Sequence, residues 1–260
     1  MVISDGELAV RAALAGADVV RAMYGGGLAR VEKSGGDFAT SADLAAEEAI
    51  LGVIRQARPG DAVTGEESGR SGSGERMWLV DPLCGTLNYA VRTMLVAVNV
   101  ALRAGAGVVA AASADPFAEE VFWTDGERAW ARRGGADERL APSADSRLVE
   151  VNLDPPFPNA PAFRAAALLA DPRFGERFRP RVVSSTVAVA WVASGQRAAY
   201  VTDGDQRDSV HFAAGIAVCR AAGCVVTGLD GLPVETSRTG GLIVAADGET
   251  HAELLRLAAL

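Results

Sequence analysis

Two acidic clusters in the first third of the chain combine residue types that can hold a hard metal ion beside a phosphate. The first is the triplet Gly65-Glu66-Glu67, which follows a short apolar stretch. The second is Asp81, which ends the apolar run Trp78-Leu79-Val80. An Asp at the end of a buried strand can place its carboxylate at the carboxyl edge of a sheet. Glu66 and Asp81 together would supply the oxygen ligands that Mg²⁺ prefers.

The residues that follow Asp81 predict a site for an anion. The sequence runs through Pro82 into Gly85-Thr86, where a helix is expected to begin. The start of a helix offers free backbone N–H groups and the positive end of its dipole to a negative ligand. A bound Mg²⁺ usually bridges to a substrate phosphate. The combination of carboxylates and a helix start therefore predicts phosphate chemistry.

The composition disfavours several other classes of protein. The chain has 260 residues and a net charge of −8, which argues against a nucleic-acid polymer or an anionic membrane as partner, because both require basic surfaces. No apolar run approaches the roughly 20 residues of a membrane span, and no signal peptide is visible at the N-terminus. The three cysteines show no zinc-finger spacing and cannot form a disulfide framework. A reducing, cytoplasmic location is expected.

The elements expected to position the acidic clusters begin with two helices. Ser4 and Glu7 have the spacing of a capping box and precede an apolar helical face that ends at glycines 25–27. A second helix is expected to begin with Ser41 as its N-cap and to end before Pro59-Gly60. Its buried face is predicted to consist of Leu44, Ile50, Leu51 and Ile54.

A largely β layer is expected to follow these helices. The glycine- and serine-rich residues 69–74 predict a surface loop, and Asp125-Gly126 predicts a hairpin turn. The strands are predicted at residues 62–64, 77–80, 95–102, 107–113, 120–123 and around 129–130.

The second half of the chain alternates between strands and helices. Its strands are predicted at residues 148–153, 182–183, 198–201 and 242–246, and its helices at residues 162–169, 187–193, 211–222 and 249–257. Such alternation is typical of α/β layers with sites at strand ends. The proline-rich segment 155–161 suggests a division into an N-terminal half, residues 1–154, and a C-terminal half, residues 155–260, of one compact unit.

In this order and spacing, the motifs resemble those of the inositol monophosphatase superfamily of Mg²⁺-dependent, lithium-sensitive phosphomonoesterases. The resemblance runs from about residue 5 to 260. It implies a layered αβαβα sandwich in which both halves contribute to one cleft, and a homodimer. The motifs that carry it are D-F-A-T-S-A-D at 37–43, G-E-E-S at 65–68, W-L-V-D-P-L-C-G-T-L-N-Y at 78–89, S-S-T with V-A-S-G between 184 and 195, and F-A-A-G-I-A-V-C-R-A-A-G-C at 212–224.

The resemblance also implies roles for individual residues. The first metal position would be formed by Glu66, Asp81 and the backbone carbonyl of Leu83, and Glu66 is also assigned to catalysis. Thr86 and Asp43 would activate the attacking water. The implied substrate-binding residues are Lys33, which is the only lysine of the chain, the backbone amides of Gly85 and Thr86, and Ser185 and Thr186, with Thr186 on the alcohol side of the substrate.

Two departures from the family pattern concern the second metal position. The pattern D-P-x-D-G-T has Asp where this chain has Cys84, and the pattern W-D-x-A-A-G has Asp where this chain has His211. Val210 replaces the tryptophan of the second pattern, and Ala198 stands where the family usually has Asp. The loop 203–208, which contains three further aspartates, is about two residues longer than the pattern.

Three interpretations of Cys84 and His211 remain open. The second position could be lost, leaving an enzyme with one metal ion. Alternatively, the two residues could hold a softer metal such as Zn²⁺ or Mn²⁺ with Asp81 and Asp208. They could also act as a thiolate nucleophile and its base. Because the resemblance places both residues at the same former metal position, all three predict that their side chains approach within about 4–6 Å. Cys219 and Cys224 are expected to be core residues.

The function that follows is hydrolysis of a small phosphorylated alcohol, such as an inositol, sugar or nucleotide phosphate. Two alternatives remain. The chain could be a catalytically impaired pseudophosphatase that binds a phosphorylated ligand, or a repurposed family member that uses Cys84 and His211 for metal or group-transfer chemistry. The retained Glu66, Asp81 and Thr86 favour the enzyme, and the loss of both second-site aspartates favours the alternatives.

Overall fold

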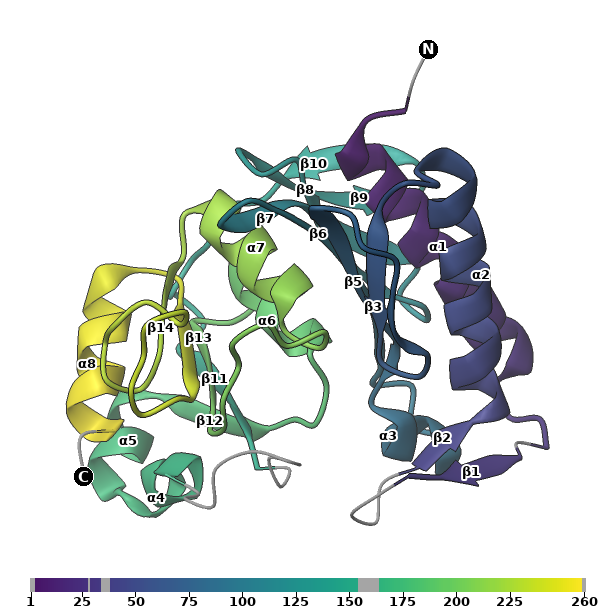
Figure 1. Ribbon diagram of the computed structural model, residues 1–260. Coiled ribbons are helices and arrows are strands. Elements are labelled where there is room, and N and C mark those ends of the chain that lie inside the picture. The colour runs from purple at the N-terminus through teal and green to yellow at the C-terminus, as the bar shows by residue number, and fades with distance from the viewer. Residues whose placement is uncertain (1–2, 28, 34–37, 154–163, 259–260) are drawn as a thin grey trace. The chain divides into compact units, whose positions relative to one another are not determined.

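The computed structural model describes residues 3–27, 29–33, 38–153 and 164–258. Its contacts divide the chain into two compact units (Figure 1). Unit 1 consists of Met1–Arg139, Ser185–Val187 and Val210–Val218, and unit 2 of Leu140–Ser184, Ala188–Ser209 and Cys219–Leu260. The proline-rich boundary predicted at 155–161 lies outside the described residues, so the division into residues 1–154 and 155–260 stays a prediction. The segment that carries His211 belongs to unit 1.

Unit 1 begins with two long helices, α1 (Asp5–Met23) and α2 (Ser41–Ala57). Ser4 is the N-cap of α1, as predicted, and its hydroxyl accepts a hydrogen bond of 3.2 Å from the backbone N–H of Glu7. The Glu7 carboxylate forms an ion pair of 2.9 Å with Arg132 on strand β9. The cap fixes the start of α1, and the ion pair ties its first turn to the sheet.

The start of α2 differs from the prediction, because its N-cap is Thr40 and not Ser41. The Thr40 hydroxyl accepts from the backbone N–H of Ala42, and the Asp43 carboxylate accepts from the backbone N–H of Thr40 at 2.7 Å. This reciprocal pairing requires an acidic residue three positions after the cap, which Thr40 has and Ser41 lacks. Leu44 is 45% exposed and does not belong to the buried face. Asp37, the first residue of the D-F-A-T-S-A-D motif, lies outside the described residues.

An eight-stranded sheet forms the centre of unit 1, in the order β10-β9-β8-β7-β6-β5-β3-β4. Only β3 and β5 run parallel, and the other neighbours are antiparallel. A separate antiparallel pair, β1 and β2, precedes α2. The strands are β1 (Arg30–Glu32), β2 (Phe38–Thr40), β3 (Ala62–Gly65), β4 (Gly69–Ser71), β5 (Arg76–Cys84), β6 (Ala97–Ala104), β7 (Gly107–Asp115), β8 (Glu120–Thr124), β9 (Ala129–Arg133) and β10 (Ala136–Arg139).

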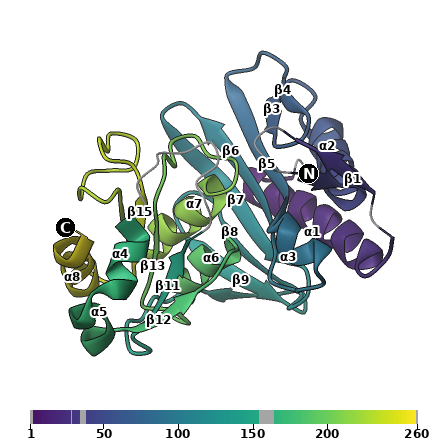
Figure 2. The ribbon, with the colours of Figure 1, turned by 90° about the horizontal axis from the view of Figure 1, so that it is seen from below.

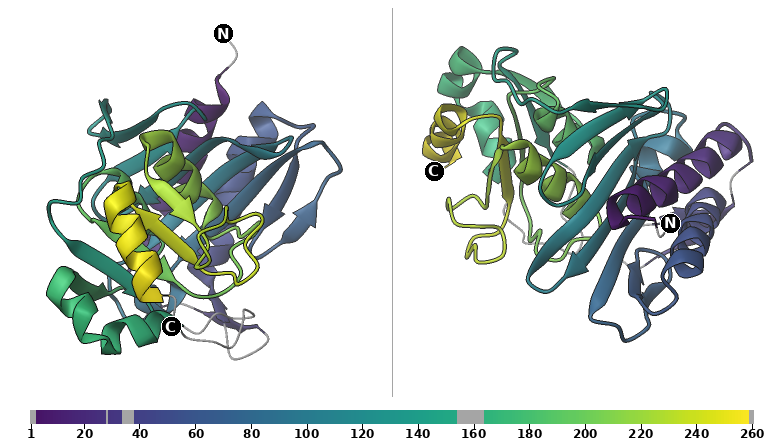
Figure 3. Two further views of the ribbon diagram at one scale, coloured as in Figure 1. Left: turned by 90° about the vertical axis from the view of Figure 1, so that its left-hand side faces the viewer. Right: turned by 90° about the horizontal axis from the view of Figure 1, so that it is seen from above.

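The helices α1 and α2 lie side by side on one face of this sheet (Figures 2 and 3). They pack closely, since a Cβ atom on Gly16 of α1 would lie 2.7 Å from Ile50 of α2 and 3.0 Å from Val98 of β6. The opposite face of the sheet carries a smaller cluster, in which Ala214 and Ala217 pack against residues such as Leu79. Side chains of the central strands are therefore buried on both faces, as expected for strands with continuous apolar runs.

Unit 2 contains a five-stranded mixed sheet in the order β12-β11-β13-β15-β14. Its core joins the sheet to helices α4, α5 and α8; α8 is the yellow helix of Figure 3. The strands are β11 (Leu148–Asn152), β12 (Arg179–Val182), β13 (Ala199–Thr202), β14 (Val225–Thr227) and β15 (Leu242–Ala245), and the helices are α4 (Arg164–Ala170), α5 (Pro172–Arg177) and α8 (Gly248–Ala258). The start of the helix predicted at 162–169 lies outside the described residues.

Three more helices complete the chain: α3 (Thr86–Ala90), α6 (Val187–Ala193) and α7 (Ala213–Ala222). The helix predicted to begin at Thr86 and the one at 187–193 are confirmed, while α7 begins at Ala213 and not at His211. Among the described residues, none of the helices has the length and apolar character needed to cross a membrane.

Candidate active site

Glu66, Glu67 and Ser68 form the turn of a hairpin between β3, which ends at Gly65, and β4. Residues 69–71 are therefore a strand and not part of the predicted surface loop. Glu47 of α2 fixes this turn, because its carboxylate accepts from the backbone N–H groups of Glu67 at 2.9 Å and Ser68 at 2.8 Å. A Cβ atom on Gly65 would lie 2.6 Å from that carboxylate. Glycine at position 65 therefore allows α2 to approach and to hold the turn.

The register of β3 and β5 places Glu66 next to the end of β5. Gly65 pairs with Val80, and the backbone N–H of Glu66 donates to the Val80 carbonyl at 3.0 Å. Glu66 Oε2 is buried and has no hydrogen-bond partner among the described residues. Burial raises the pKa of Glu66 well above its usual range, and the charge of Asp81 raises it further. Two neighbouring carboxylates in a buried place are typical of a cation site.

Lys33 reaches this acidic turn from outside the sheet. Its ammonium group forms ion pairs of 3.1 Å with Glu66 Oε1 and 2.7 Å with Glu67 Oε1. Partial burial would lower the pKa of Lys33, but the two carboxylates raise it above its usual value. The only lysine of the chain is therefore charged and lies beside Glu66, while its assignment to substrate binding stays a prediction.

Asp81 is completely buried, and both of its carboxylate oxygens are held. Oδ1 accepts from the backbone N–H of Leu83 at 3.2 Å, and Oδ2 lies 2.8 Å from His211 Nδ1. Asn99 lies opposite Asp81 in the β5–β6 pair, and its amide is 3.5 Å from the same Oδ2. The β5–β6 register shifts between Asp81 and Cys84, an irregularity that re-aims side chains at the end of a strand.

Thr86 and Asp43 come together as predicted, although 43 residues separate them. The Thr86 hydroxyl is 2.8 Å from Asp43 Oδ1 and 3.1 Å from the Leu83 carbonyl oxygen. Burial raises the pKa of Asp43, while hydrogen bonds from Thr40 and Thr86 oppose the rise. Gly85 places Thr86 at the start of α3 through a left-handed backbone with φ of +100°, which favours glycine. The geometry leaves a hydroxyl and a carboxylate paired beside the Leu83 carbonyl.

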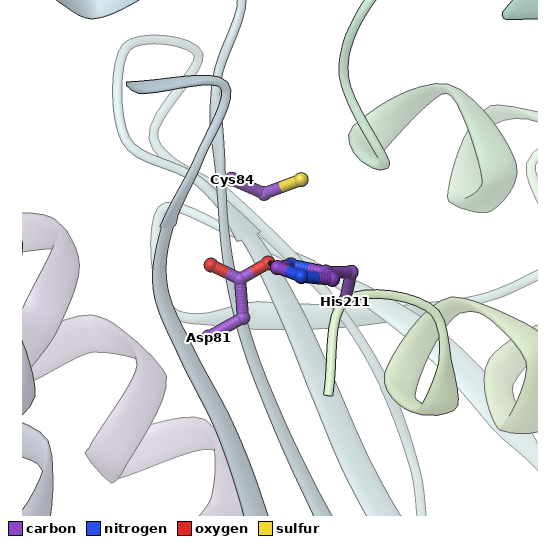
Figure 4. Close-up of side chains that lie close together, drawn as sticks. All are labelled: Asp81, Cys84 and His211. Carbon is purple, nitrogen blue, oxygen red and sulfur yellow. Dashed lines mark hydrogen bonds and ion pairs between the residues drawn. The ribbon is translucent and has the colours of Figure 1, made fainter. Parts of the chain in front are cut away.

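The side chains of Asp81, Cys84 and His211 form a compact group (Figure 4). One ligand atom from each lies within 4.8 Å of the other two, which confirms that Cys84 and His211 approach each other. Desolvation would lower the pKa of His211, but the Asp81 carboxylate raises it well above its usual value. Burial and the Asp81 charge raise the pKa of the Cys84 thiol to about 11. The hydrogen bond and the charge of His211 lower the pKa of this thiol, but they do not offset burial and Asp81, so the thiolate interpretation stays a prediction.

A buried polar chain behind Asp81 joins the predicted Thr186 to Asn99 and Ser113, two residues to which the sequence analysis assigns no role. Asn99 donates to the Thr186 hydroxyl at 2.8 Å, and the Ser113 hydroxyl donates to Asn99 Oδ1 at 2.8 Å. All three side chains are almost fully buried, as is the predicted Ser185. The one available signal is that Asn99 interrupts an apolar run of residues 95–102. A polar residue inside such a run requires a buried partner.

All of the predicted site residues belong to unit 1. Asp208, which the sequence suggests as a further metal ligand, belongs to unit 2. Among the described residues, the side chains that could together hold a metal ion are Asp81, Cys84 and His211. Cys219 and Cys224 are buried, as predicted. The Cys219 thiol donates to the Val189 carbonyl at 3.1 Å within unit 2.

Comparison with known proteins identifies the class to which this fold and site belong. Residues 5–259 match the inositol monophosphatase family, and the chain belongs to it. The inositol-1-monophosphatase of Caulobacter vibrioides is 30% identical over 234 residues, which cover 86% of this chain and 88% of that protein.

Solved structures agree with this assignment. The extragenic suppressor protein suhB of Bartonella henselae superposes with a TM-score of 0.84 at 25% identity and covers 97% of both chains. The IMPase of Thermotoga maritima has a TM-score of 0.81 at 22% identity and covers 97% of this chain and 95% of its own. The predicted family and α/β fold class are thus confirmed, and the chain is a phosphatase of a Mg²⁺-dependent class.

Proposed function

We propose that this protein hydrolyses the phosphate monoester of a small phosphorylated alcohol, such as an inositol, sugar or nucleotide phosphate. The observation that carries the proposal is the Glu66 carboxylate. Its Oε2 is buried and has no hydrogen-bond partner among the described residues, and the charge of Asp81 acts on it. Such a pair suits a cation with a preference for oxygen ligands. Glu66, Asp81 and the Leu83 carbonyl would hold Mg²⁺.

The residues around this position have complementary roles in the proposed reaction. A bound Mg²⁺ would neutralise phosphate charge and lower the pKa of a water molecule. The Thr86 hydroxyl donates to Asp43 Oδ1, which leaves the Thr86 oxygen able to accept a hydrogen bond from the attacking water. In this arrangement Asp43 orients Thr86 and receives the proton. Lys33 would balance the acidic turn and meet the phosphate, with Gly85, Ser185 and Thr186 completing the substrate site.

The second metal position does not fit a hard cation, because a thiol and an imidazole replace two carboxylates there. This observation supports the second candidate function, a pseudophosphatase that binds a phosphorylated ligand without turnover. The intact pairing of Thr86 with Asp43 favours the enzyme, since a binding protein has no need for it. The homodimer and the cytoplasmic location stay predictions.

The test is a screen for phosphate release from inositol, sugar and nucleotide phosphates, run separately with Mg²⁺, Mn²⁺ and Zn²⁺. We expect Mg²⁺-dependent turnover that Asp81→Asn reduces by about 100-fold or more. Loss of a residue that only hydrogen-bonds to a metal ligand already lowers metal affinity or activity by about 10–100-fold, and Asp81 is a proposed ligand itself. Asp145→Asn, at an exposed position, is the matched control. Undiminished turnover in Asp81→Asn would refute the proposed metal position. Thermal stabilisation by a phosphorylated compound without any phosphate release would identify the pseudophosphatase.

A further inference from the structure

We propose that Asp81, Cys84 and His211 form a zinc site at the position where the family pattern has a second hard cation. The proposal deepens the proposed function, on which it rests for the role of Asp81 as a shared ligand. The binding of zinc itself can be measured without turnover. The chemical class of ligand is a borderline transition-metal ion, and the family's two aspartates are replaced by the two side chains that zinc prefers, Cys and His.

The distances within the group fit a single ion. Zinc ligands lie 2.0–2.3 Å from the metal, so ligand atoms on a tetrahedral ion are about 3.3–3.8 Å apart. The three ligand atoms here lie within 4.8 Å of one another, and His211 Nδ1 and Asp81 Oδ2 are 2.8 Å apart. A bound ion would replace the proton between these two atoms. The movements required are a few tenths of an ångström to about one ångström.

Groups around the ligands already orient them. The backbone N–H of Leu83 holds Asp81 Oδ1, and the Asn99 amide is directed at Oδ2. Thr186 forms a hydrogen bond with the Cys84 thiol and accepts one from Asn99. Such outer contacts are a regular part of protein metal sites, because they fix the direction of each ligand.

The number of ligands predicts what kind of zinc site this is. Three protein ligands leave the fourth tetrahedral position for water or a substrate oxygen, whereas structural zinc sites have four protein ligands. His211 is 42% exposed in its side chain, so the group is accessible to an ion from solvent, while Asp81 is fully buried. In Figure 4 the Cys84 side chain lies above the Asp81 carboxylate, and the His211 ring lies beside one of its oxygens.

Metal binding to the full chain, treated with a chelator and then dialysed, tests the proposal directly. Zn²⁺ is titrated in competition with a chromophoric chelator, and Co²⁺ is added separately as a spectroscopic probe. We expect about one Zn²⁺ per chain and a thiolate-to-cobalt charge-transfer band with Co²⁺. Cys84→Ser should abolish the band and weaken zinc binding by about 10–100-fold or more. Cys224→Ser, which removes a buried thiol elsewhere, should leave both unchanged.

Two further variants keep the test decisive if Cys84→Ser does not fold. His211→Gln should weaken zinc binding to a similar extent, and Cys84→Asp should shift the preference from Zn²⁺ towards Mg²⁺. The proposal is overturned if the wild-type chain binds no zinc, or if zinc and cobalt bind equally well to Cys84→Ser and His211→Gln. Zinc binding without phosphate release would support the zinc site and refute the proposed function. Phosphate release without zinc binding would support the proposed function and overturn the zinc site.

Discussion

Thr86 is the residue whose chemistry separates an enzyme from a binding protein at this site. Its hydroxyl lies between Asp43 Oδ1 and the Leu83 carbonyl oxygen. We expect Thr86→Val to lower kcat by about 10²–10⁴-fold, the usual range for loss of general acid–base assistance, with a smaller effect on KM. Thr86→Ser keeps the hydroxyl and should retain most of the activity. Equal losses of kcat in the two variants would show that the hydroxyl is not used.

The charged form of Glu66 is expected to lower the stability of the folded protein, because the side chain is buried and lies near the Asp81 carboxylate. Its raised pKa means that the folded protein favours the neutral form of this side chain, so the charged form opposes folding at neutral pH. Glu66→Gln should therefore raise the Tm of the chelator-treated protein by about 2–4 °C, equivalent to about 1 kcal/mol. The same variant should lose the stabilisation that Mg²⁺ gives the wild type.

Calorimetry with and without Mg²⁺ measures both effects, and Glu75→Gln, at an exposed position, is the control. A lower Tm for chelator-treated Glu66→Gln would mean that the ion pair with Lys33 outweighs the repulsion by Asp81.

At the scale of elements, the sequence predicts the long helices and the buried strands and misses several short exposed strands. The long helices α1 and α2 and the buried strands β5 to β8 have periodic or continuous apolar patterns. Strands β1, β4 and β10 have three or four residues, all of them exposed. Their sequences therefore show no alternation of apolar and polar residues that would predict a strand. A short exposed strand forms because a neighbouring strand pairs with its backbone through hydrogen bonds. The residues of the short strand alone do not show that this partner is present.

The packing of α1 against α2 and β6 gives a matched pair of glycine substitutions. A Cβ atom at Gly16 would lie 2.7 Å from Ile50, so Gly16→Ala should destabilise the protein by about 1–3 kcal/mol through overpacking. A Cβ atom at Gly52, on the exposed side of α2, would meet no atom of the described residues within 4 Å, so Gly52→Ala should stabilise by about 0.5–1 kcal/mol. Urea unfolding at constant m measures both. Stabilisation by Gly16→Ala would contradict the close approach of the helices.

At the scale of the whole molecule, motif order and spacing predict the family, and the register of strands decides the details of the site. Glu66, Asp81 and Thr86 follow from motifs, whereas the bond between His211 and Asp81 joins residues 130 positions apart. Asn99 could not be assigned a partner from the sequence, because Ser113 and Thr186 reach it from another strand and from a distant segment. Such long-range contacts leave no local pattern for a single sequence to show.

The pH dependence of stability involves the chain's two histidines in opposite ways. His251 of α8 is buried and hydrogen-bonded through Nε2 to Thr227 Oγ1 at 2.7 Å, and burial lowers its pKa in the folded protein. Below the unfolded value of about 6.5, the unfolded chain therefore binds more protons at this position than the folded chain does. Its contribution to stability is present at neutral pH and is lost as the pH falls.

His251→Gln, which keeps a hydrogen-bonding side chain, should flatten this acid dependence. We expect the free energy of unfolding of the wild type to decrease more steeply than that of the variant between about pH 7.5 and 5.5, with the difference greatest at the acid end. Urea titrations of chelator-treated protein at each pH measure it. His211, whose pKa is raised, is present in both proteins, so its opposite contribution cancels in the difference. Parallel curves for the two proteins would show that His251 is protonated equally in the folded and unfolded chains.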